Sequence, residues 1–315
     1  MENIFIKEFE AGKRIIGYYI IKSYNLKTSS NNKKYLDLTL MDKTGEVNGK
    51  IWGIDDEAVK DYKSGMVIKV EGDVTLWNNT LQLKIIRYRP VNEEDEINIE
   101  DFVPAAPIET ESMYQQVMTF KEMIQDEEIR TLVGEIYEEY RGKLLYYPAA
   151  KMHHHAIYGG LLYHVLRMLM TGEKLCEVYP VNKDLLFAGI MLHDIEKINE
   201  MDADDMGIVG EYTRDGQLLG HIIQGIVKID HVGKAIAMED EKIKLIQHMI
   251  LSHHYEPEYG SPKKPMIPEA ELLHYIDMID ARMYDMDKVL GTQAPGEFSE
   301  PVFVLDKRRL YKATF

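Results

Sequence analysis

The chain has 315 residues, of which 45% are hydrophobic and 29% are charged, and its formal net charge is -16. This composition excludes a disordered chain, and the acidic balance argues against a protein that coats nucleic acid through charge alone. The single cysteine, Cys176, excludes a disulfide framework and a cysteine-rich zinc site. The apolar run 185–192 is far shorter than the roughly 20 residues of a membrane-spanning helix. Since the first residues also lack an apolar leader, we expect a protein of the reducing cytoplasm without a membrane partner.

The charges and the histidines divide the chain into three parts. Residues 1–90 carry a net charge of +3, residues 91–112 carry -8 without a basic residue, and residues 113–315 carry -11. All 11 histidines lie between His153 and His274. We therefore predict an N-terminal domain over 1–90, an acidic, proline-containing linker over 91–112, and a second domain over 113–315.

The first 90 residues have the pattern of a small β-barrel. Five segments are rich in β-branched and aromatic residues, and several alternate with a period of two, as Leu36, Leu38 and Leu40 do. The predicted strands are 14–22, 35–42, 46–52, 66–77 and 80–89, with a short helix over 54–65 that ends at Gly65. Five strands with a helix after the third is the order of an OB-fold.

This barrel carries aromatic and basic side chains of the kind that bind single-stranded nucleic acid. OB-folds stack bases on aromatic rings within a basic groove. The alternative is that the rings fill the barrel and the cations only solvate its surface. The substrate-binding candidates are Tyr35, Trp52, Trp77, Lys84 and Arg87. A domain charge of only +3 predicts weak, salt-sensitive binding.

From Met113 onward the apolar period changes to about 3.6 residues, which predicts an all-α domain. Glycine, proline and asparagine separate its segments. The expected helices are 113–125, 127–140, 153–178, 183–197, 218–237, 240–253 and 268–290.

Imidazole and carboxylate side chains recur in these mostly apolar helical segments. Such a group either finds a hydrogen-bond partner or binds a metal, and for a single histidine the first case is the more common. The ordered set is more informative: His164, His193, Asp194, His221, His253, His254 and Asp277. Two histidines and two aspartates can hold one ion, and a bridging aspartate with further histidines can hold a second. Without thiolates, the suitable ions are manganese, iron, cobalt, nickel and zinc.

The order of these residues resembles a known pattern. His164, then His193-Asp194, then Asp277 is similar to the H…HD…D pattern of the HD-domain phosphohydrolase superfamily. His221, His253 and the HDxxK sequence at 193–197 resemble features of its binuclear branches. Whole segments, from the OB strands to the C-terminal DKRRLYK, resemble the YhaM-type 3'→5' exoribonuclease family. These segments are IEDFVPAAP, YYPAAKMHHHAIYGGLLYH, AGIMLHDIEKINE, GQLLGHI, LSHHYEPEYGSP and EAELLHYIDMIDARM.

The resemblance implies a multidomain chain, with an all-β OB-fold barrel followed by an all-α HD domain that binds two divalent ions. Manganese is the first choice, and cobalt, iron, nickel and zinc are the alternatives. The implied core ligands are His164, His193, Asp194 and Asp277. Asp194 would bridge to a second ion held by His221 and His253, and His254 would either join that ion or meet the substrate.

The resemblance also implies the catalytic and substrate-binding residues. Asp194 and Lys197 would be catalytic, with Lys197 facing the phosphate. His154 and His155 match a histidine pair that would line the substrate site. His153 adds a third imidazole, which leaves open which of the three faces the pocket. After His254 the chain lacks an HHExxDGxGYP run, which argues against a cyclic-di-GMP phosphodiesterase.

The implied activity is metal-dependent removal of nucleotides from the 3' end of single-stranded RNA, or of single-stranded DNA, as nucleoside 5'-monophosphates. A metal-bound hydroxide would attack the phosphodiester, and Lys197 would offset the developing negative charge. Three alternatives stay open: a phosphohydrolase of nucleotides or short oligonucleotides, a non-catalytic factor that binds single strands, and a di-iron oxygenase. Assembly into a homo-oligomer also stays open, as does the native metal.

Overall fold

The computed structural model describes residues 3–29, 31–54, 63–78, 80–92, 94–95, 97–151 and 155–315, which fold into two units. The first unit comprises Met1–Ala105 with Asp204–Met206, and the second comprises Ala106–Ala203 and Gly207–Phe315. The boundaries predicted from the sequence, a linker over residues 91–112 between two domains, stay a prediction. Within the described ranges, no helix combines the length and the apolar character that crossing a membrane requires.

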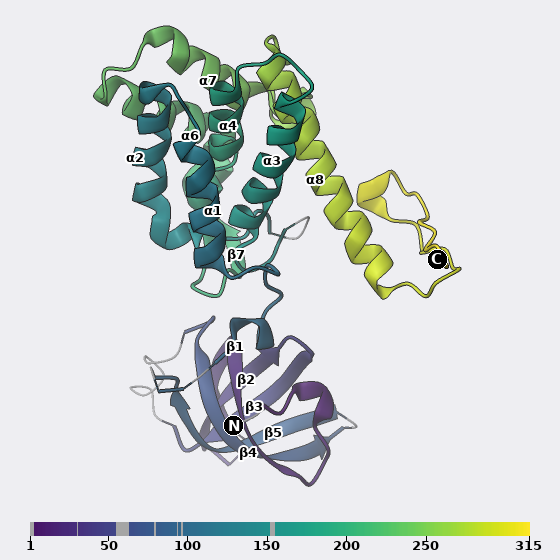
Figure 1. The fold of residues 1–315 in the computed structure, drawn as a ribbon. Helices are drawn as coiled ribbons and strands as arrows, with labels where there is room; N and C mark the ends of the chain where they lie inside the picture. The colour runs from purple at the N-terminus through teal and green to yellow at the C-terminus, as the bar shows by residue number, and fades with distance from the viewer. Residues whose placement is uncertain are drawn as a thin grey trace. The chain divides into compact units, whose positions relative to one another are not determined.

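The first unit is a closed five-stranded β-barrel (Figure 1). Its strands are β1 (Arg14–Thr28), β2 (Lys34–Asp42), β3 (Gly45–Trp52), β4 (Val67–Trp77) and β5 (Thr80–Pro90). The strands pair in the order β1-β2-β3-β5-β4, and each pair is antiparallel except β3 with β5. All five strands lie where the sequence predicts them, although β1 continues past the expected end at residue 22 through an irregularity between Ile21 and Ser23.

Alternation along the strands builds the core of the barrel. Leu36, Leu38 and Leu40 of β2 are completely buried, because every second side chain of the strand points inward. The 3-10 helices η1 (Ile6–Glu8) and η3 (Ile99–Asp101) belong to the same unit. Most of the helix predicted over 54–65 falls on residues 55–62, which lie outside the described residues.

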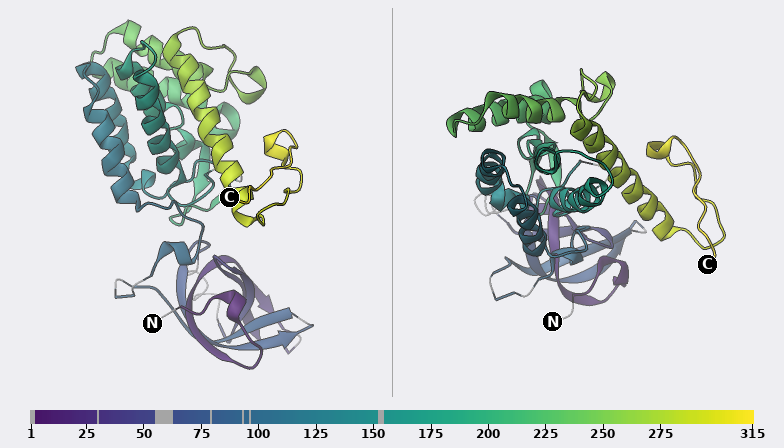
Figure 2. Two further views of the ribbon diagram at one scale, coloured as in Figure 1. Left: turned by 45° about the vertical axis from the view of Figure 1, so that its right-hand side comes forward. Right: turned by 45° about the horizontal axis from the view of Figure 1, so that its top comes forward.

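The second unit is a helical bundle (Figures 1 and 2). Its helices are α1 (Thr110–Glu122), α2 (Glu127–Leu144), α3 (Gly160–Cys176), α4 (Lys183–Leu192), α5 (Lys197–Glu200), α6 (Arg214–Ala235), α7 (Asp240–Ser252) and α8 (Pro268–Thr292), with the 3-10 helices η4 (Pro257–Tyr259) and η5 (Phe303–Leu305). Helix α4 is central, since it packs against α2, α3, α7 and α8. The C-terminal part of α8 reaches beyond the other helices (Figure 2).

Three details of the helical unit differ from the sequence prediction. The helix expected from residue 153 begins at Gly160, because Gly159 just before it has a left-handed φ of 67°. The helix expected over 183–197 is interrupted by a turn over 193–196. The expectation of an all-α domain misses an antiparallel pair, β6 (Met201–Ala203) and β7 (Val209–Tyr212), whose strands are too short to show an alternating pattern.

Candidate metal centre

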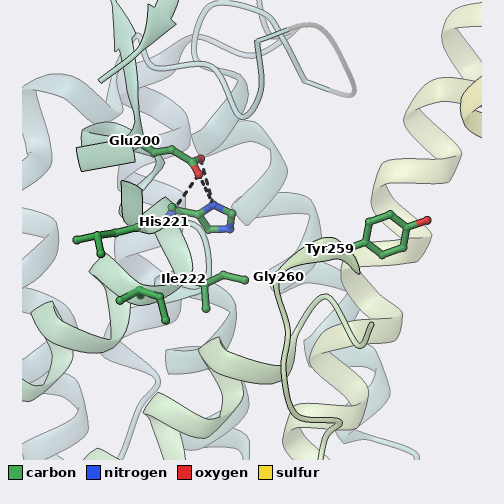
Figure 3. A pocket seen from close by; sticks show the side chains of 8 residues that line it. Glu200, His221, Ile222, Tyr259 and Gly260 are labelled. Carbon is green, nitrogen blue, oxygen red and sulfur yellow. Dashed lines mark hydrogen bonds and ion pairs between the residues drawn. The ribbon is translucent and has the colours of Figure 1, made fainter. Parts of the chain in front are cut away.

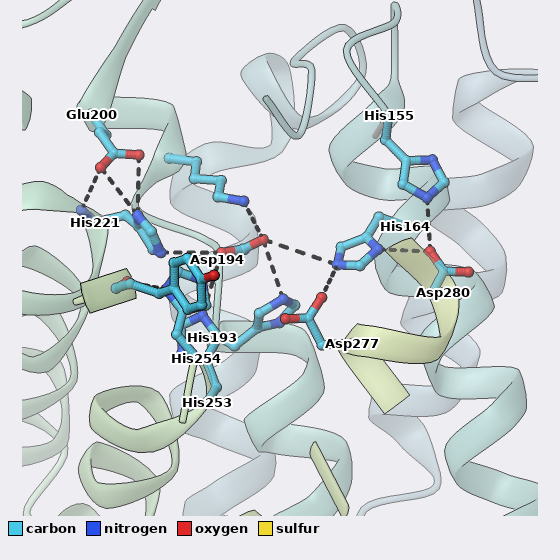
Figure 4. A network of polar contacts seen from close by, with 12 residues as sticks. His155, His164, His193, Asp194, Glu200, His221, His253, His254, Asp277 and Asp280 are labelled. Carbon is cyan, nitrogen blue, oxygen red and sulfur yellow. Dashed lines mark hydrogen bonds and ion pairs between the residues drawn. The ribbon is translucent and has the colours of Figure 1, made fainter. Parts of the chain in front are cut away.

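Asp194 lies just beyond the carboxyl end of the buried helix α4. Every residue from Leu185 to Leu192 is buried, which explains the unbroken apolar run. The side chain of Met249 on α7 fills the space beside Gly189, where a Cβ would lie 2.2 Å from its Cε. The turn that follows α4 brings the carboxylate of Asp194 into a cluster of imidazoles from the same turn, α3, α6 and the end of α7, together with Asp277 of α8 (Figure 4).

One carboxylate oxygen of Asp194 faces a first group of ligands. Its Oδ2 lies 3.2 Å from Nε2 of His193 and 4.0 Å from Nε2 of His164 on α3. The same nitrogen of His164 lies 3.3 Å from Oδ1 of Asp277 on α8. One ligand atom each from His164, His193 and Asp277 falls within 4.8 Å of the other two, which is close enough for one ion.

The other carboxylate oxygen of Asp194 faces a second group. Its Oδ1 lies 3.3 Å from Nε2 of His221 on α6 and 3.9 Å from Nε2 of His253 at the end of α7. His254 joins this group, and one ligand atom from each of the four residues falls within 4.8 Å of the others. The structure thus brings together all seven residues predicted as ligands, with Asp194 between the two groups (Figure 4).

Buried polar atoms in this cluster have the chemistry of a metal site. Nε2 of His193, His221 and His253 and Oδ1 of Asp194 are buried without a hydrogen-bond partner among the described residues. Leaving a buried polar group without a partner costs about 1–3 kcal/mol. Four such atoms that converge on one place fit a divalent ion with nitrogen and oxygen ligands, and the absence of thiolates favours the first-row metals named above.

Backbone carbonyls orient three of the imidazoles. Nδ1 of His193 donates to the carbonyl oxygen of Ile190 at 2.8 Å, and Nδ1 of His253 donates to that of Ile250 at 2.7 Å. His254 bonds through Nδ1 to the carbonyl oxygen of Tyr259 at 2.6 Å. With Nδ1 engaged, Nε2 of each ring is the nitrogen left to bind a metal.

Carboxylates orient the other two imidazoles. Nδ1 of His221 lies 3.1 Å from each carboxylate oxygen of Glu200, and its backbone amide also donates to Glu200. Nδ1 of His164 lies 2.8 Å from Oδ2 of Asp280, which also receives a hydrogen bond from Nε2 of His155 at 2.7 Å. A carboxylate behind a ligating histidine fixes its tautomer and makes it a stronger ligand.

Sequence reasoning missed Glu200 and Asp280 as site residues. Asp280 follows Asp277 by three residues on α8, so the two share a face of the helix, and this spacing was a usable signal. Glu200 lies 21 residues before His221, its partner, and no spacing in the sequence links the two.

Lys197 lies inside the cluster, as the HDxxK spacing predicts. Its ammonium Nζ is 2.7 Å from Oδ2 of Asp194, and only 12% of its side chain is exposed. Glu196, the residue before it, is buried and accepts hydrogen bonds from the Tyr140 hydroxyl and the Asn199 amide, each at 2.7 Å. These bonds hold the turn that places Lys197 beside Asp194.

The two aspartates of the cluster are ionised. Burial raises the pKa of Asp194, but the charges of His193 and Lys197 outweigh it and hold that pKa well below its usual range. Burial likewise raises the pKa of Asp277, but the hydrogen bond and the charge of His164 outweigh this effect, so that the pKa lies well below its usual value. Carboxylates must be deprotonated to bind a metal, so both are in the required state.

The imidazoles differ in their protonation. Burial lowers the pKa of His253 well below its usual value, and the neighbouring His254 adds to the effect, so its ring is neutral. Burial also lowers the pKa of His164, but hydrogen bonds to Asp277 and Asp280 outweigh it and raise the pKa to about 9. Nε2 of His164 therefore carries a proton that a bound cation would displace.

Of the predicted pair His154 and His155, the structure describes only His155. His155 is completely buried and contacts Asp280, so it stands behind His164, and its ring lies 4.0 Å from that of Tyr284. Its predicted place in the substrate site stays a prediction, as do the roles of the other candidates. His153 and His154 lie outside the described residues.

The predicted aromatic residues of the barrel lie on its outside. Tyr35 on β2 and Trp52 on β3 pair in register and stack, with ring centroids 4.6 Å apart and planes 27° apart. The ammonium of Lys50 is 5.5 Å from the centroid of the Tyr35 ring. Lys84 on β5 is in register with Lys50, so the two lysines lie on the same outer face of the barrel as the stacked rings.

Two further candidates of the barrel lie on β4 and β5. Trp77, at the end of β4, is 65% exposed, so neither tryptophan fills the core. Arg87 on β5 is exposed, with one guanidinium nitrogen 3.9 Å from a carboxylate oxygen of Glu71.

Comparison with protein families agrees with both units. Residues 161–282 match the HD domain, and residues 21–91 match an OB-fold nucleic acid binding domain. The predicted fold class, an N-terminal five-stranded OB-type barrel followed by a helical HD domain, is confirmed. The HD match spans all the candidate ligands, from His164 to Asp277, and supports a metal-dependent phosphohydrolase.

Several solved structures are similar to part of the chain. The second OB-fold domain of replication protein A from Methanococcus maripaludis is 18% identical, with a TM-score of 0.25, over 31% of this chain and 100% of that one. A mitochondrial single-stranded DNA binding protein from S. cerevisiae is 19% identical, with a TM-score of 0.22, over 26% of this chain and 97% of that one. At these values neither likeness bears on what this chain binds.

Proposed function

We propose that this chain is a metal-dependent 3'→5' exoribonuclease similar to the YhaM type, with single-stranded DNA as a second substrate. The observation that carries the proposal is the position of Asp194, whose two carboxylate oxygens face two different groups of imidazoles. A bridging carboxylate between two ligand groups is the arrangement of a two-ion site that hydrolyses phosphodiesters.

The ligand groups define what each ion would contact. The first ion would be held by His164, His193, Asp277 and Asp194, and the second by Asp194, His221, His253 and His254. Two divalent ions bound there would activate water and neutralise charge on the scissile phosphate. Asp280 and Glu200 hold the rings of His164 and His221 in the orientation that such binding needs.

Lys197 supplies a positive charge at the same place. Burial lowers the pKa of its ammonium, but the adjacent Asp194 raises it by a larger amount, so the group stays protonated. A fixed cation in a site shielded from water stabilises the negative charge that develops on a phosphate during hydrolysis. This role needs no proton transfer by Lys197.

The surface of the barrel favours the hypothesis of a polymeric substrate over that of a free nucleotide. The stacked rings of Tyr35 and Trp52, flanked by the ammonium of Lys50, suit successive bases and the backbone of a single strand. A nucleotide monomer would have no use for this face. Holding the strand there would raise the concentration of its 3' end at the metal centre.

The proposal is tested with 5'-labelled single-stranded RNA, single-stranded DNA and nucleoside triphosphates, each incubated with and without manganese. We expect a ladder of products that shorten from the 3' end, together with nucleoside 5'-monophosphates, only when manganese is present. Asp194→Asn should abolish this activity, and Asp287→Asn, which alters an exposed aspartate of α8, should not.

Each alternative gives a different result in this assay. Turnover of nucleotides alone would favour a nucleotide phosphohydrolase, and binding of RNA without any turnover would favour a non-catalytic factor. Activity that survives Asp194→Asn unchanged would contradict the assignment of the site.

A further inference from the structure

A cavity of about 190 Å³ opens beside the second ligand group (Figure 3). His221 and Glu200 supply its polar lining, and the rest of the wall is formed by Leu219, Gly220, Ile222, Ile223, Tyr259 and Gly260. His221 therefore belongs to two places at once: its Nε2 faces Asp194, and its ring borders the cavity.

Two glycines line this space. Gly220, with φ 67° and ψ 168°, interrupts the helical backbone of α6 immediately before His221 and lets the His221 amide reach Glu200. Gly260 has a φ of 97°, and a Cβ at that position would lie 3.3 Å from Cδ1 of Ile222. A larger residue at position 260 would therefore narrow the cavity.

Away from His221 and Glu200, the wall of the cavity is mostly apolar and partly open to solvent. Leu219 is 52% exposed and Ile223 is 41% exposed, although both stand next to a strongly polar cluster. Apolar side chains exposed at the mouth of a pocket commonly mark a ligand-binding surface. The carboxylate of Glu200, already bonded to His221, would repel a phosphate at this point.

We propose that this cavity holds the nucleobase of the nucleotide that is being released, while its 5'-phosphate lies at the metal centre. This inference rests on the proposed function and adds the subsite for the 3'-terminal base. A nucleobase has flat, weakly polar faces that aliphatic side chains cover well, and covering Leu219 and Ile223 removes apolar surface from water. Because Leu219, Ile223 and the ring of Tyr259 offer apolar surface that does not distinguish one base from another, the subsite should accept all four bases.

The test is equilibrium binding of two probes to the manganese-loaded, full-length protein by calorimetry. Adenosine 5'-monophosphate carries the base, and ribose 5-phosphate lacks it. We expect the wild-type protein to bind the monophosphate about tenfold more tightly, the change expected for covering a small apolar area. Leu219→Ala should reduce this ratio toward one. Leu218→Ala is the matched control, because Leu218 is an exposed neighbour that does not line the cavity, and it should keep the ratio.

Equal binding of the two probes by the wild-type protein, or an unchanged ratio in Leu219→Ala, would overturn the subsite. A second arm compares the hydrolysis of RNA with a normal and with an abasic 3'-terminal nucleotide, and the abasic end should be released more slowly. If no RNA is hydrolysed but the probe preference and its loss in Leu219→Ala persist, the subsite stands and the exoribonuclease proposal fails.

Discussion

The ring of His164 donates its Nδ1 hydrogen to Oδ2 of Asp280 over 2.8 Å, while its Nε2 faces Asp277 3.3 Å away. The same Asp280 carboxylate is held by His155 and by the guanidinium of Arg167. Asp280 therefore fixes His164 through Nδ1 and leaves Nε2 as the nitrogen that would bind the first ion.

Asp280→Asn should weaken manganese binding by about 10- to 100-fold, because the amide is a poorer acceptor for the His164 ring. Titration calorimetry measures this change. Asp287→Asn, on the same helix but exposed, provides the control and should bind manganese as the wild type does. Equal affinity in the two variants would show that Asp280 does not position His164.

Glu200→Gln should weaken the binding of the second ion and leave the binding of the first ion unchanged. Glu200 contacts His221, which belongs only to the second group, so the first ion should stay bound. Elemental analysis after dialysis at low manganese should give a metal content near one ion per chain for this variant and near two for the wild type. Loss of both ions together would argue against separate ligand groups.

Lys197→Met should reduce kcat while both ions stay bound. The substitution keeps most of the side-chain volume but removes the charge next to Asp194, and losing such a stabilising group typically costs about 100-fold in rate. Single-turnover hydrolysis of RNA at saturating manganese measures the effect. An unchanged rate would mean that Lys197 only neutralises Asp194 in the metal-free protein.

Removing metal should destabilise the helical unit. Ions that bind only the folded chain stabilise it, and manganese at roughly 1,000 times its Kd should raise Tm by about 10 °C relative to the protein in chelator. A thermal melt followed by circular dichroism measures this shift. His193→Ala should lose most of it, and the same shift in that variant would place the stabilising ion elsewhere.

Trp52→Ala should weaken the binding of single-stranded RNA by about 5- to 100-fold, the usual value of one base stacked on an aromatic ring. The matched control is Leu76→Ala, which removes an exposed apolar side chain of β4. Fluorescence anisotropy with labelled RNA measures both. If the two variants bind alike, the ring pair of Tyr35 and Trp52 does not contact RNA.

The sequence predicted most of the fold where one periodicity dominates. The period of two in Leu36, Leu38 and Leu40 located β2, and the apolar run 185–192 located the central helix. The interruption at His193 escaped prediction because the turn is held by contacts with distant residues, such as the hydrogen bond from Tyr140 to Glu196. The β6–β7 pair escaped it because its strands are short. A strand of three residues, such as Met201–Ala203, offers no pattern to detect.

The ligand cluster could be predicted because its members are unusual residues for apolar helices and come in a known order. The residues behind them could not be found in the same way. Asp280 contacts His164 across 116 positions of sequence, and Glu200 contacts His221 across 21. Such pairings are set by how α3 packs on α8 and how α5 packs on α6, which only the fold reveals.

The most direct test of the account is the anomalous scattering of manganese in crystals of the protein. The account predicts two peaks, one beside His164, His193 and Asp277 and one beside His221 and His253, with Asp194 in contact with both. A single peak, or peaks that do not share Asp194, would contradict it.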